Sequence, residues 1–283
     1  MQSKNLGNIN KLNLDNNLTE VQNFRLSGLN ERSNQVDELK KLWIDTFGDT
    51  KEYVNTFFDK FYSPDNVIVY KENGKIVSSL YMIDYCLKYN DKYYKIMYLY
   101  ALATDNEYRC KGIMSMLIDK ADKIMHNKGY VGAFLIPAEE SLYDYYGRFG
   151  FTDIIYNKKY TELNSDYLYN YSYVECYDND KVYEIDNSYR YLENTRIVLS
   201  AEQNEFMCKT FIDEGGKIYI NSDKDKYIMA NTYECDEKLV IYSTNDYSLY
   251  DKTYVKTGLF KKNVEVFTGK FDVSKLNLDK ILE

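Results

Sequence analysis

A long strand-like run leads directly into a helix near the middle of this chain. The run 93–104 consists almost entirely of aromatic and aliphatic residues, which is typical of a buried central strand. From Gly112 onward, apolar residues recur at helical spacing and form one broad face. Residues 105–111 join the two, and this loop ends in the basic stretch Arg109-Cys110-Lys111 before Gly112. This junction restricts the fold more than any other feature, because it favours an α/β layout built around it.

The loop at this junction predicts an anion-binding site. The first backbone N–H groups of a helix have no partner within the helix, and the positive end of the helix dipole lies behind them. Gly112 lets the backbone approach a ligand closely, and Arg109 and Lys111 add positive charge. Ala101 and Ala103 leave room for a slender ligand along the strand. The pattern indicates a pyrophosphate cradle; the alternative is a plain basic helix start with a flexible glycine.

Hydrophobic periodicity predicts an α/β domain that ends near residue 160. Two helices are expected first, with Ser33 as the N-cap of the first, and a hairpin follows with an Asn73-Gly74 turn. The expected elements are helices from 33 and over 53–61, strands over 66–70, 76–87 and 93–104, a helix from 112, a strand over 131–136, a helix over 139–148 and a strand over 151–156.

The C-terminal part of the chain has a different charge. Residues 1–160 carry equal numbers of acidic and basic side chains, so the whole net charge of −8 lies in residues 161–283. Residues 161–180 are strongly acidic and are predicted to be a linker or an exposed edge. A capping box at Ser200–Gln203 then predicts a helix that Gly215-Gly216 ends. Three further strands are expected at 217–220, 227–230 and 239–242.

Composition excludes several classes of function. The acidic charge has the wrong sign for sequence-independent binding to nucleic acid or an anionic membrane, and a mean hydropathy of −0.56 excludes an integral membrane protein. His126 is the single histidine, and it lies near the end of a predicted helix, so we expect no metal site and no histidine-dependent nucleophile. The cysteines form no Cys-x-x-Cys pair, and the Asn-rich start has no apolar stretch of signal-peptide length; both indicate a cytoplasmic protein.

A second motif follows the predicted cradle. Residues 146–151 have the pattern Tyr-x-x-x-Gly-Phe, after a strand and a short helix. With the earlier Arg-x-x-Gly, this is similar to the signature of the GNAT superfamily of acyl-CoA-dependent N-acetyltransferases. The closer resemblance, over about residues 33–155, is to tandem GNAT proteins related to the enhanced-intracellular-survival acetyltransferases. It rests on Leu42-Trp43, Phe47-Gly48-Asp49, Ala103-Thr104, Glu107-Tyr108-Arg109, Gly112-Ile113-Met114 and Leu135-Ile136-Pro137-Ala138. Met114, where a small residue is usual, and Asn106, where proline is usual, depart from it.

The resemblance implies an α/β fold with two domains. An N-terminal GNAT fold, with a mixed, mostly antiparallel sheet flanked by helices, precedes a smaller, degenerate GNAT-like α/β domain. We expect a flexible polar extension over 1–20, the GNAT acetyltransferase domain over 21–160 and the degenerate domain over 161–283. The segment 243–248 follows the last predicted strand without a glycine or a basic residue. The second domain is therefore expected to have lost the cofactor loop, which leaves one acetyl-CoA site.

The resemblance also implies direct attack of a substrate amine on the thioester of acetyl-CoA. The backbone near 102–104 would bind the pantetheine and steady the carbonyl oxygen, and the cradle would hold the pyrophosphate. Tyr146 aligns with the family tyrosine that protonates the leaving thiolate; the alternative is a core tyrosine in a tyrosine-rich helix. The residues expected to bind acetyl-CoA are Leu102, Ala103, Thr104, Arg109, Cys110, Lys111, Gly112, Ile113, Met114 and Ser115.

Three carboxylates are candidates for the general base: Glu139, Glu140 and the chain terminus at Glu283. The resemblance to survival-type relatives implies a base at the chain terminus, but we expect no third domain like theirs in this chain, which weakens the carry-over to Glu283. Solvated surface carboxylates are the preferred explanation for all three groups. The acidic second half suggests a cationic small-molecule or peptide amine as acceptor, although a solvated acidic surface explains the charge equally well. A homo-oligomer is compatible with the family.

Two other functions remain open. One is a non-catalytic protein that binds acyl-CoA or docks a partner and keeps the cradle without a working base. The other is an aminoacyl transferase of the tandem-GNAT type that uses charged tRNA. The intact cradle and the acidic charge argue against the second of these.

Overall fold

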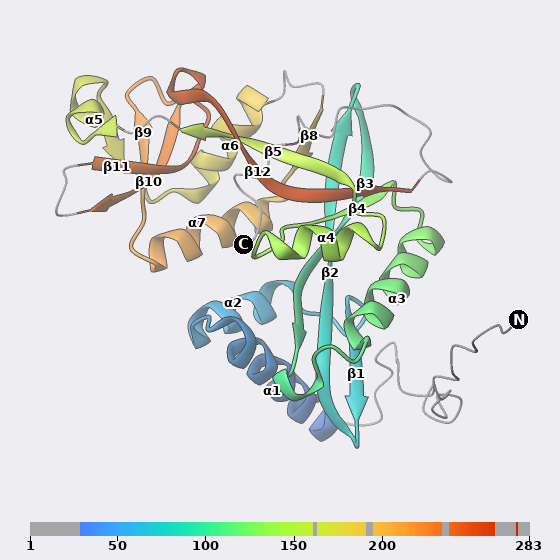
Figure 1. The fold of residues 1–283 in the computed structure, drawn as a ribbon. Helices are drawn as coiled ribbons and strands as arrows, with labels where there is room; N and C mark the ends of the chain where they lie inside the picture. Colours follow the sequence, from blue (N-terminus) through green and yellow to red (C-terminus); the bar gives the residue numbers. More distant parts are fainter. Residues whose placement is uncertain (1–28, 161–162, 191–194, 234–237, 264–275, 277–283) are drawn as a thin grey trace, which may run out of the picture.

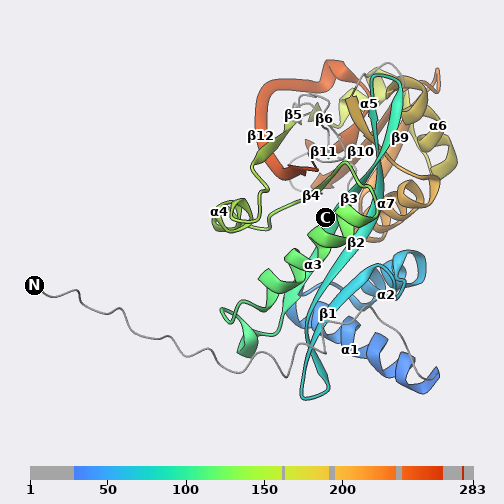
Figure 2. The ribbon, with the colours of Figure 1, turned by 90° about the vertical axis from the view of Figure 1, so that its right-hand side faces the viewer.

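The computed structural model describes residues 29–160, 163–190, 195–233, 238–263 and 276, which form two β-sheets with helices packed on them (Figures 1 and 2). The elements before residue 161 are α1 (Leu29–Phe47), α2 (Lys51–Phe61), β1 (Val67–Glu72), β2 (Lys75–Tyr89), β3 (Lys92–Thr104), the 3₁₀ turn η1 (Asn106–Tyr108), α3 (Ile113–Asn127), β4 (Gly132–Leu135), α4 (Ser141–Gly147) and β5 (Asp153–Tyr160). The later elements are β6 (Leu163–Asn164), α5 (Asp166–Asn170), β7 (Tyr173–Glu175), α6 (Asn179–Arg190), β8 (Thr195–Val198), α7 (Ala201–Asp213), β9 (Lys217–Asn221), β10 (Tyr227–Tyr233), β11 (Lys238–Thr244), η2 (Tyr247–Leu249) and β12 (Tyr250–Lys262).

The predicted order of elements up to residue 160 is confirmed. Asn73 and Gly74, with φ of 51° and 81°, form the left-handed turn of the β1–β2 hairpin. The prediction of Ser33 as an N-cap is wrong, because α1 already begins at Leu29. No glycine or proline separates Leu29 from Ser33, so nothing in the sequence ends the helix there.

The larger sheet takes one strand from the far end of the chain. Its order is β1-β2-β3-β4-β12-β5, and β8 also pairs with β2. β12 lies between β4 and β5, with Phe260 opposite Phe134 and Leu259 opposite Ile154 (Figure 1). β3 and β4 are parallel, and the other pairs are antiparallel. The division into 21–160 and 161–283 stays a prediction, but a cut at residue 160 would separate β12 from the strands it joins.

Some elements of the C-terminal part do not match the sequence prediction. The segment 161–180 was expected to be a linker or an exposed edge; its described residues contain β6, α5, β7 and the start of α6, so it is not a linker. β6 and β7 are the two edge strands of the smaller sheet, which agrees with the second alternative. β8, α6 and β12 were not predicted. β12 mixes aromatic and aliphatic residues with lysines and threonines without strict alternation, so it has no clear strand pattern of its own. Its partners lie in the remote strands β4 and β5 and give no local signal.

The smaller sheet, β6-β11-β10-β9-β7, is antiparallel throughout. The capping box on α7 is confirmed, since the side chains of Ser200 and Gln203 each accept from the other's backbone N–H. Apart from β8, the order α6, α7, β9, β10, β11 repeats the order α1, α2, β1, β2, β3. The repetition extends to a capped 3₁₀ turn, because Asp105 accepts from Glu107 N–H and Asp246 from Ser248 N–H. After η1 the chain forms α3, whereas after η2 it forms β12.

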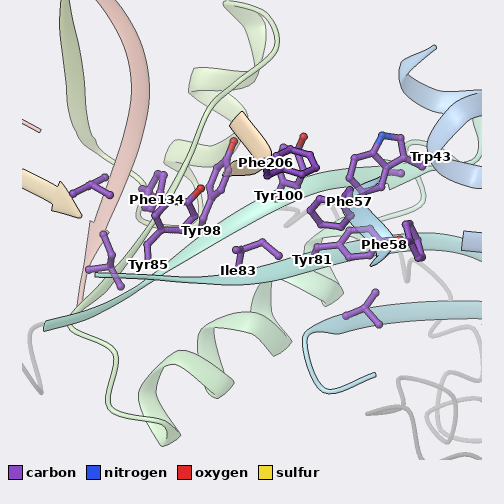
Figure 3. Close-up of a cluster of buried hydrophobic side chains, with 14 of the residues drawn as sticks. Trp43, Phe57, Phe58, Tyr81, Ile83, Tyr85, Tyr98, Tyr100, Phe134 and Phe206 are labelled. Carbon is purple, nitrogen blue, oxygen red and sulfur yellow. The ribbon is translucent and has the colours of Figure 1, made fainter. Parts of the chain in front are cut away.

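An aromatic core joins the larger sheet to α1, α2 and α7 (Figure 3). Trp43 of α1 contacts Phe57, Tyr81 and Tyr100, with ring centroids 4.7 to 5.4 Å apart. Phe206 of α7 is fully buried against the same cluster. Buried aromatic rings contribute large apolar areas and favourable edge contacts, so this cluster ties the C-terminal part to the first helices. The opposite face of the sheet packs against α3 and α4.

Candidate active site

The central strand β3 contains a bulge near its carboxyl end. Ser79 pairs with Ala103 and Tyr81 pairs with Tyr100, so a single residue of β2 opposes two residues of β3. Ala101, the first of these two, has a φ of 45°, which is rare for a residue with a side chain. Bulges turn peptide groups out of the regular ladder and are frequent next to active sites.

The same end of β3 extends beyond the strand next to it. The parallel pairing with β4 joins residues 96–98 to residues 132–134, and β4 ends at Leu135 while β3 continues to Thr104. From Leu99 onward, therefore, β3 has no paired strand on its β4 side within the described residues. An unpaired strand edge offers N–H and C=O groups to an extended ligand.

The predicted cradle follows this edge immediately. Gly112 is the N-cap of α3 with a φ of 78°, a conformation that favours glycine. No side chain caps this helix, and its first turn contains no acidic residue. The N–H groups of the first turn, Ile113–Ser115, therefore form an uncapped, positive helix end. This arrangement fits a phosphate group.

Neighbouring groups hold the two basic side chains of the loop. The Arg109 Nε donates to the backbone oxygen of Thr104 at 3.1 Å, and the Lys111 ammonium lies 4.7 Å from the Tyr108 ring centroid. Both basic residues are exposed, as is Cys110, whose φ is 59°. The structure thus gathers the cofactor residues predicted from sequence at one end of β3. Their roles stay predictions.

Polar contacts fix the strand end from the other side. The Ser78 hydroxyl donates to the Ala103 oxygen at 2.8 Å and lies 2.9 Å from the Thr104 hydroxyl. The η1 cap, Asp105, accepts from the Glu107 N–H at 3.1 Å and from the Lys75 ammonium at 3.2 Å. These two contacts lower the pKa of the Asp105 carboxyl. The bulge and the cradle are therefore anchored to the β1–β2 hairpin.

Tyr146 lies on α4 and is 8% exposed. Its ring packs in the apolar cluster between α3 and the larger sheet. This cluster includes Leu99 of β3 and Leu135 of β4, which lie where the two strands stop pairing. Burial raises the pKa of its phenol, so the hydroxyl stays protonated in neutral solution. Within the described residues the hydroxyl has no hydrogen-bond partner. It is therefore available as a proton donor.

The candidate bases have different surroundings. Glu140 is exposed and accepts from Lys256 of β12 at 2.6 Å. Glu139 is exposed and accepts from the Ser141 hydroxyl at 2.7 Å. Glu283 lies outside the described residues. The general-base role of all three stays a prediction.

The comparisons with known proteins agree with this geometry. Residues 30–154 match the model of the acetyltransferase (GNAT) domain. Residues 30–154 form a GNAT acetyltransferase domain. Similar solved structures include a GCN5-related N-acetyltransferase from Kribbella flavida, with 14% identity, a TM-score of 0.58, and coverage of 81% of this chain and 70% of that one. No curated protein matches the sequence.

Two further solved structures share the fold of the GNAT domain and part of the chain after it. Eis1 from Mycobacterium abscessus is 8% identical with a TM-score of 0.58, over 84% of this chain and 72% of that one. A GCN5-related N-acetyltransferase from Anabaena variabilis is 14% identical with a TM-score of 0.56, over 83% and 71%. The resemblance and the mixed α/β fold predicted from the motifs are confirmed.

An acidic pair, Asp49 and Glu214, was not predicted from the sequence. Asp49, in the turn between α1 and α2, accepts from the Trp43 indole at 2.7 Å. Partial burial, and then the charges of Asp49 and Asp213, raise the pKa of Glu214, which follows α7. The negative charge of Asp49 also acts on Tyr100, the residue before the bulge. In the sequence, Asp49 stood out only as part of the motif Phe47-Gly48-Asp49, and Glu214 only through the acidic charge of the second half.

Other kinds of site find no support in the described part of the chain. Across those ranges, no group of three or more His, Cys, Asp or Glu residues is placed to hold a metal ion. No described helix is long and apolar enough to cross a membrane.

Proposed function

We propose that the chain transfers an acetyl group from acetyl-CoA to a primary amine by direct attack on the thioester. The observation that carries this proposal is the uncapped start of α3 behind Gly112, next to the unpaired edge of β3. The first-turn N–H groups, with Arg109 and Lys111 beside them, would hold the pyrophosphate. The edge at 102–104 would bind the pantetheine amides, and the turned peptide groups of the bulge would stabilise the oxyanion.

Tyr146 is proposed as the proton donor to the leaving thiolate. Its phenol stays protonated because burial raises its pKa, and it packs with residues from both sides of the unpaired edge. A positioned acid contributes about 10²- to 10⁴-fold to a rate.

Binding of acetyl-CoA is tested by thermal or urea unfolding of the full chain. At about a hundred times its Kd, acetyl-CoA should stabilise the protein by about 2.7 kcal/mol. Gly112→Ala should reduce this gain, because the added Cβ meets no protein atom and points into space where a ligand would approach. A result without any stabilisation of the unmodified protein would refute acetyl-CoA binding.

Gly129→Ala is the matched control for this experiment. Gly129 has a φ of 71°, close to the 78° of Gly112, and its added Cβ also meets no atom within 4 Å. Both substitutions should cost about 1–2 kcal/mol of backbone strain. Only Gly112→Ala should also lose stabilisation by acetyl-CoA. Equal losses in both variants would assign the effect to strain rather than to the cradle.

The acceptor is proposed to be a cationic amine with more than one positive charge. The charge of Asp49 acts on Tyr100, the residue before the bulge, and on Glu214, so the amine is proposed to approach the thioester past these two carboxylates. Negative potential raises the local concentration of cations and is screened by salt. Acetylation of spermidine should therefore slow more between about 0.05 M and about 0.5 M salt than acetylation of a monoamine.

Glu214→Gln should lower kcat/KM for spermidine by about three- to tenfold and leave the monoamine less affected. Asp223→Asn is the control, since Asp223 is an exposed acid in the turn between β9 and β10. Release of CoA measures both reactions. If both substitutions have the same effect, or if salt has none, the acidic pair does not select the acceptor.

A further inference from the structure

A cavity of about 660 Å³ lies beside β2, away from the cradle. It is lined by the end of α2 and the turn after it, by residues 82–86 of β2, by the start of β3, by the end of α3, and by residues 198–203. No residue of the cradle lines it. Small-molecule sites in proteins span about 300–1,000 Å³, so the cavity has the size of a binding site.

The cavity exists because the edge of β2 is only partly covered. β1 pairs with β2 as far as Tyr81, and β8 begins its pairing at Cys86. Between them, the buried Gln203 side chain donates to the Asp84 backbone oxygen at 2.9 Å. A side chain thus replaces a strand here, and it leaves a hollow across the edge of the sheet.

The two sides of this cavity carry opposite charges. Lys95 and Lys128 line it on the α3 side, and neither forms an ion pair with a described residue. The Lys95 ammonium lies 5.8 Å from the Tyr130 ring centroid. Asp65, in the turn after α2, and Glu202 of α7 line it from the other side, and their carboxylates likewise form no ion pair within the described ranges. Both views of the ribbon place α3 on one side of β2 and α2 with α7 on the other (Figures 1 and 2).

Two charged groups of the lining are already engaged. Lys60 pairs with Glu205 at 2.8 Å. Asp84, on the α3 side, accepts the hydroxyl of Tyr130. Asp84 keeps its negative charge, so the α3 side carries two lysines and one carboxylate, and its net charge is positive. The opposite side carries the carboxylates of Asp65 and Glu202 and is negative.

Apolar side chains separate the two charged ends. They come from both walls and from the strands between them: Phe61, Met82, Met97, Ile124 and Leu199. A ligand that fits this lining has a carboxylate at one end, an ammonium at the other and an apolar middle. We propose that the cavity binds a short zwitterionic peptide, with its carboxylate at Lys95 and Lys128 and its ammonium at Asp65 and Glu202.

The test uses isothermal titration of the full chain with the tripeptide Leu-Ala-Leu, which has free termini and an apolar body. The free peptide should bind saturably. N-acetylation or C-amidation should each weaken binding by about three- to tenfold, since each removes one charge. Saturating CoA should leave the peptide affinity unchanged, because the cavity and the cradle share no residue. This result does not depend on any acetyl transfer.

Variants assign the two ends of the peptide. Lys128→Gln should weaken binding of the free peptide and leave binding of the C-amidated peptide unchanged. Glu202→Gln should weaken binding of the free peptide and leave binding of the N-acetylated peptide unchanged. Lys123→Gln, on the same helix as the cavity wall but outside its lining, should change neither affinity. The proposal is overturned if the free peptide does not bind saturably, or if blocked and free peptides bind equally well. It is also overturned if Lys128→Gln weakens the free and the C-amidated peptide equally, or if CoA competes with the peptide.

Discussion

Tyr146→Phe is expected to lower kcat by about 10²- to 10⁴-fold while the affinity for acetyl-CoA stays unchanged. The substitution removes one hydroxyl from a side chain that is 8% exposed and keeps the ring that packs against Leu99 and Leu135. Because burial raises the pKa of the phenol, the wild-type enzyme should keep this proton donor through neutral and mildly alkaline pH. Steady-state CoA release gives kcat, and stabilisation by acetyl-CoA gives the affinity.

Tyr145→Phe is the matched control for this measurement. Tyr145 is the adjacent residue on α4, its ring lies 5.2 Å from that of Tyr146, and it is only partly buried. Its loss should leave kcat within about twofold, since it has no assigned proton-transfer role. Wild-type turnover in Tyr146→Phe would remove this tyrosine as the acid. An equal loss in both variants would point to packing of α4 instead.

Gly132→Ala is expected to lower the free energy of unfolding by about 2–4 kcal/mol. A Cβ at Gly132 would lie 2.5 Å from the Phe260 ring and 2.6 Å from the backbone oxygen of Lys261. Phe260 is fully buried, and the backbone oxygen cannot yield without moving β12 away from β4. Urea unfolding followed by circular dichroism measures the loss.

Gly147→Ala provides the comparison for this stability measurement. Gly147 ends α4, and a Cβ built there meets nothing within 4 Å. Alanine favours a helix over glycine by up to about 1 kcal/mol, so this variant should be as stable as the wild type or slightly more stable. A Gly132→Ala protein with wild-type stability would contradict the close packing of β12 on β4.

The cradle could be predicted from sequence because its signal is local. A strand, a glycine with flanking basic residues and a helix all lie within residues 93–127, so the periodicity and Gly112 were sufficient. Tyr146 was found by its place in a motif. The acidic pair of Asp49 and Glu214 was missed because its members are far apart in the chain and meet only through the packing of α7 near α1 and α2.

The sequence by itself determined the order of helices and strands up to residue 160, the start of α3 at Gly112 and the acidic charge of the second half. These features depend on short-range periodicity, capping and composition. Only the tertiary structure decided that β12 joins the larger sheet between β4 and β5, and that a gap beside β2 leaves a cavity. The reason is physical: strand pairing and cavity formation depend on contacts between residues far apart in the chain, and β12 carries no local pattern that specifies its partners.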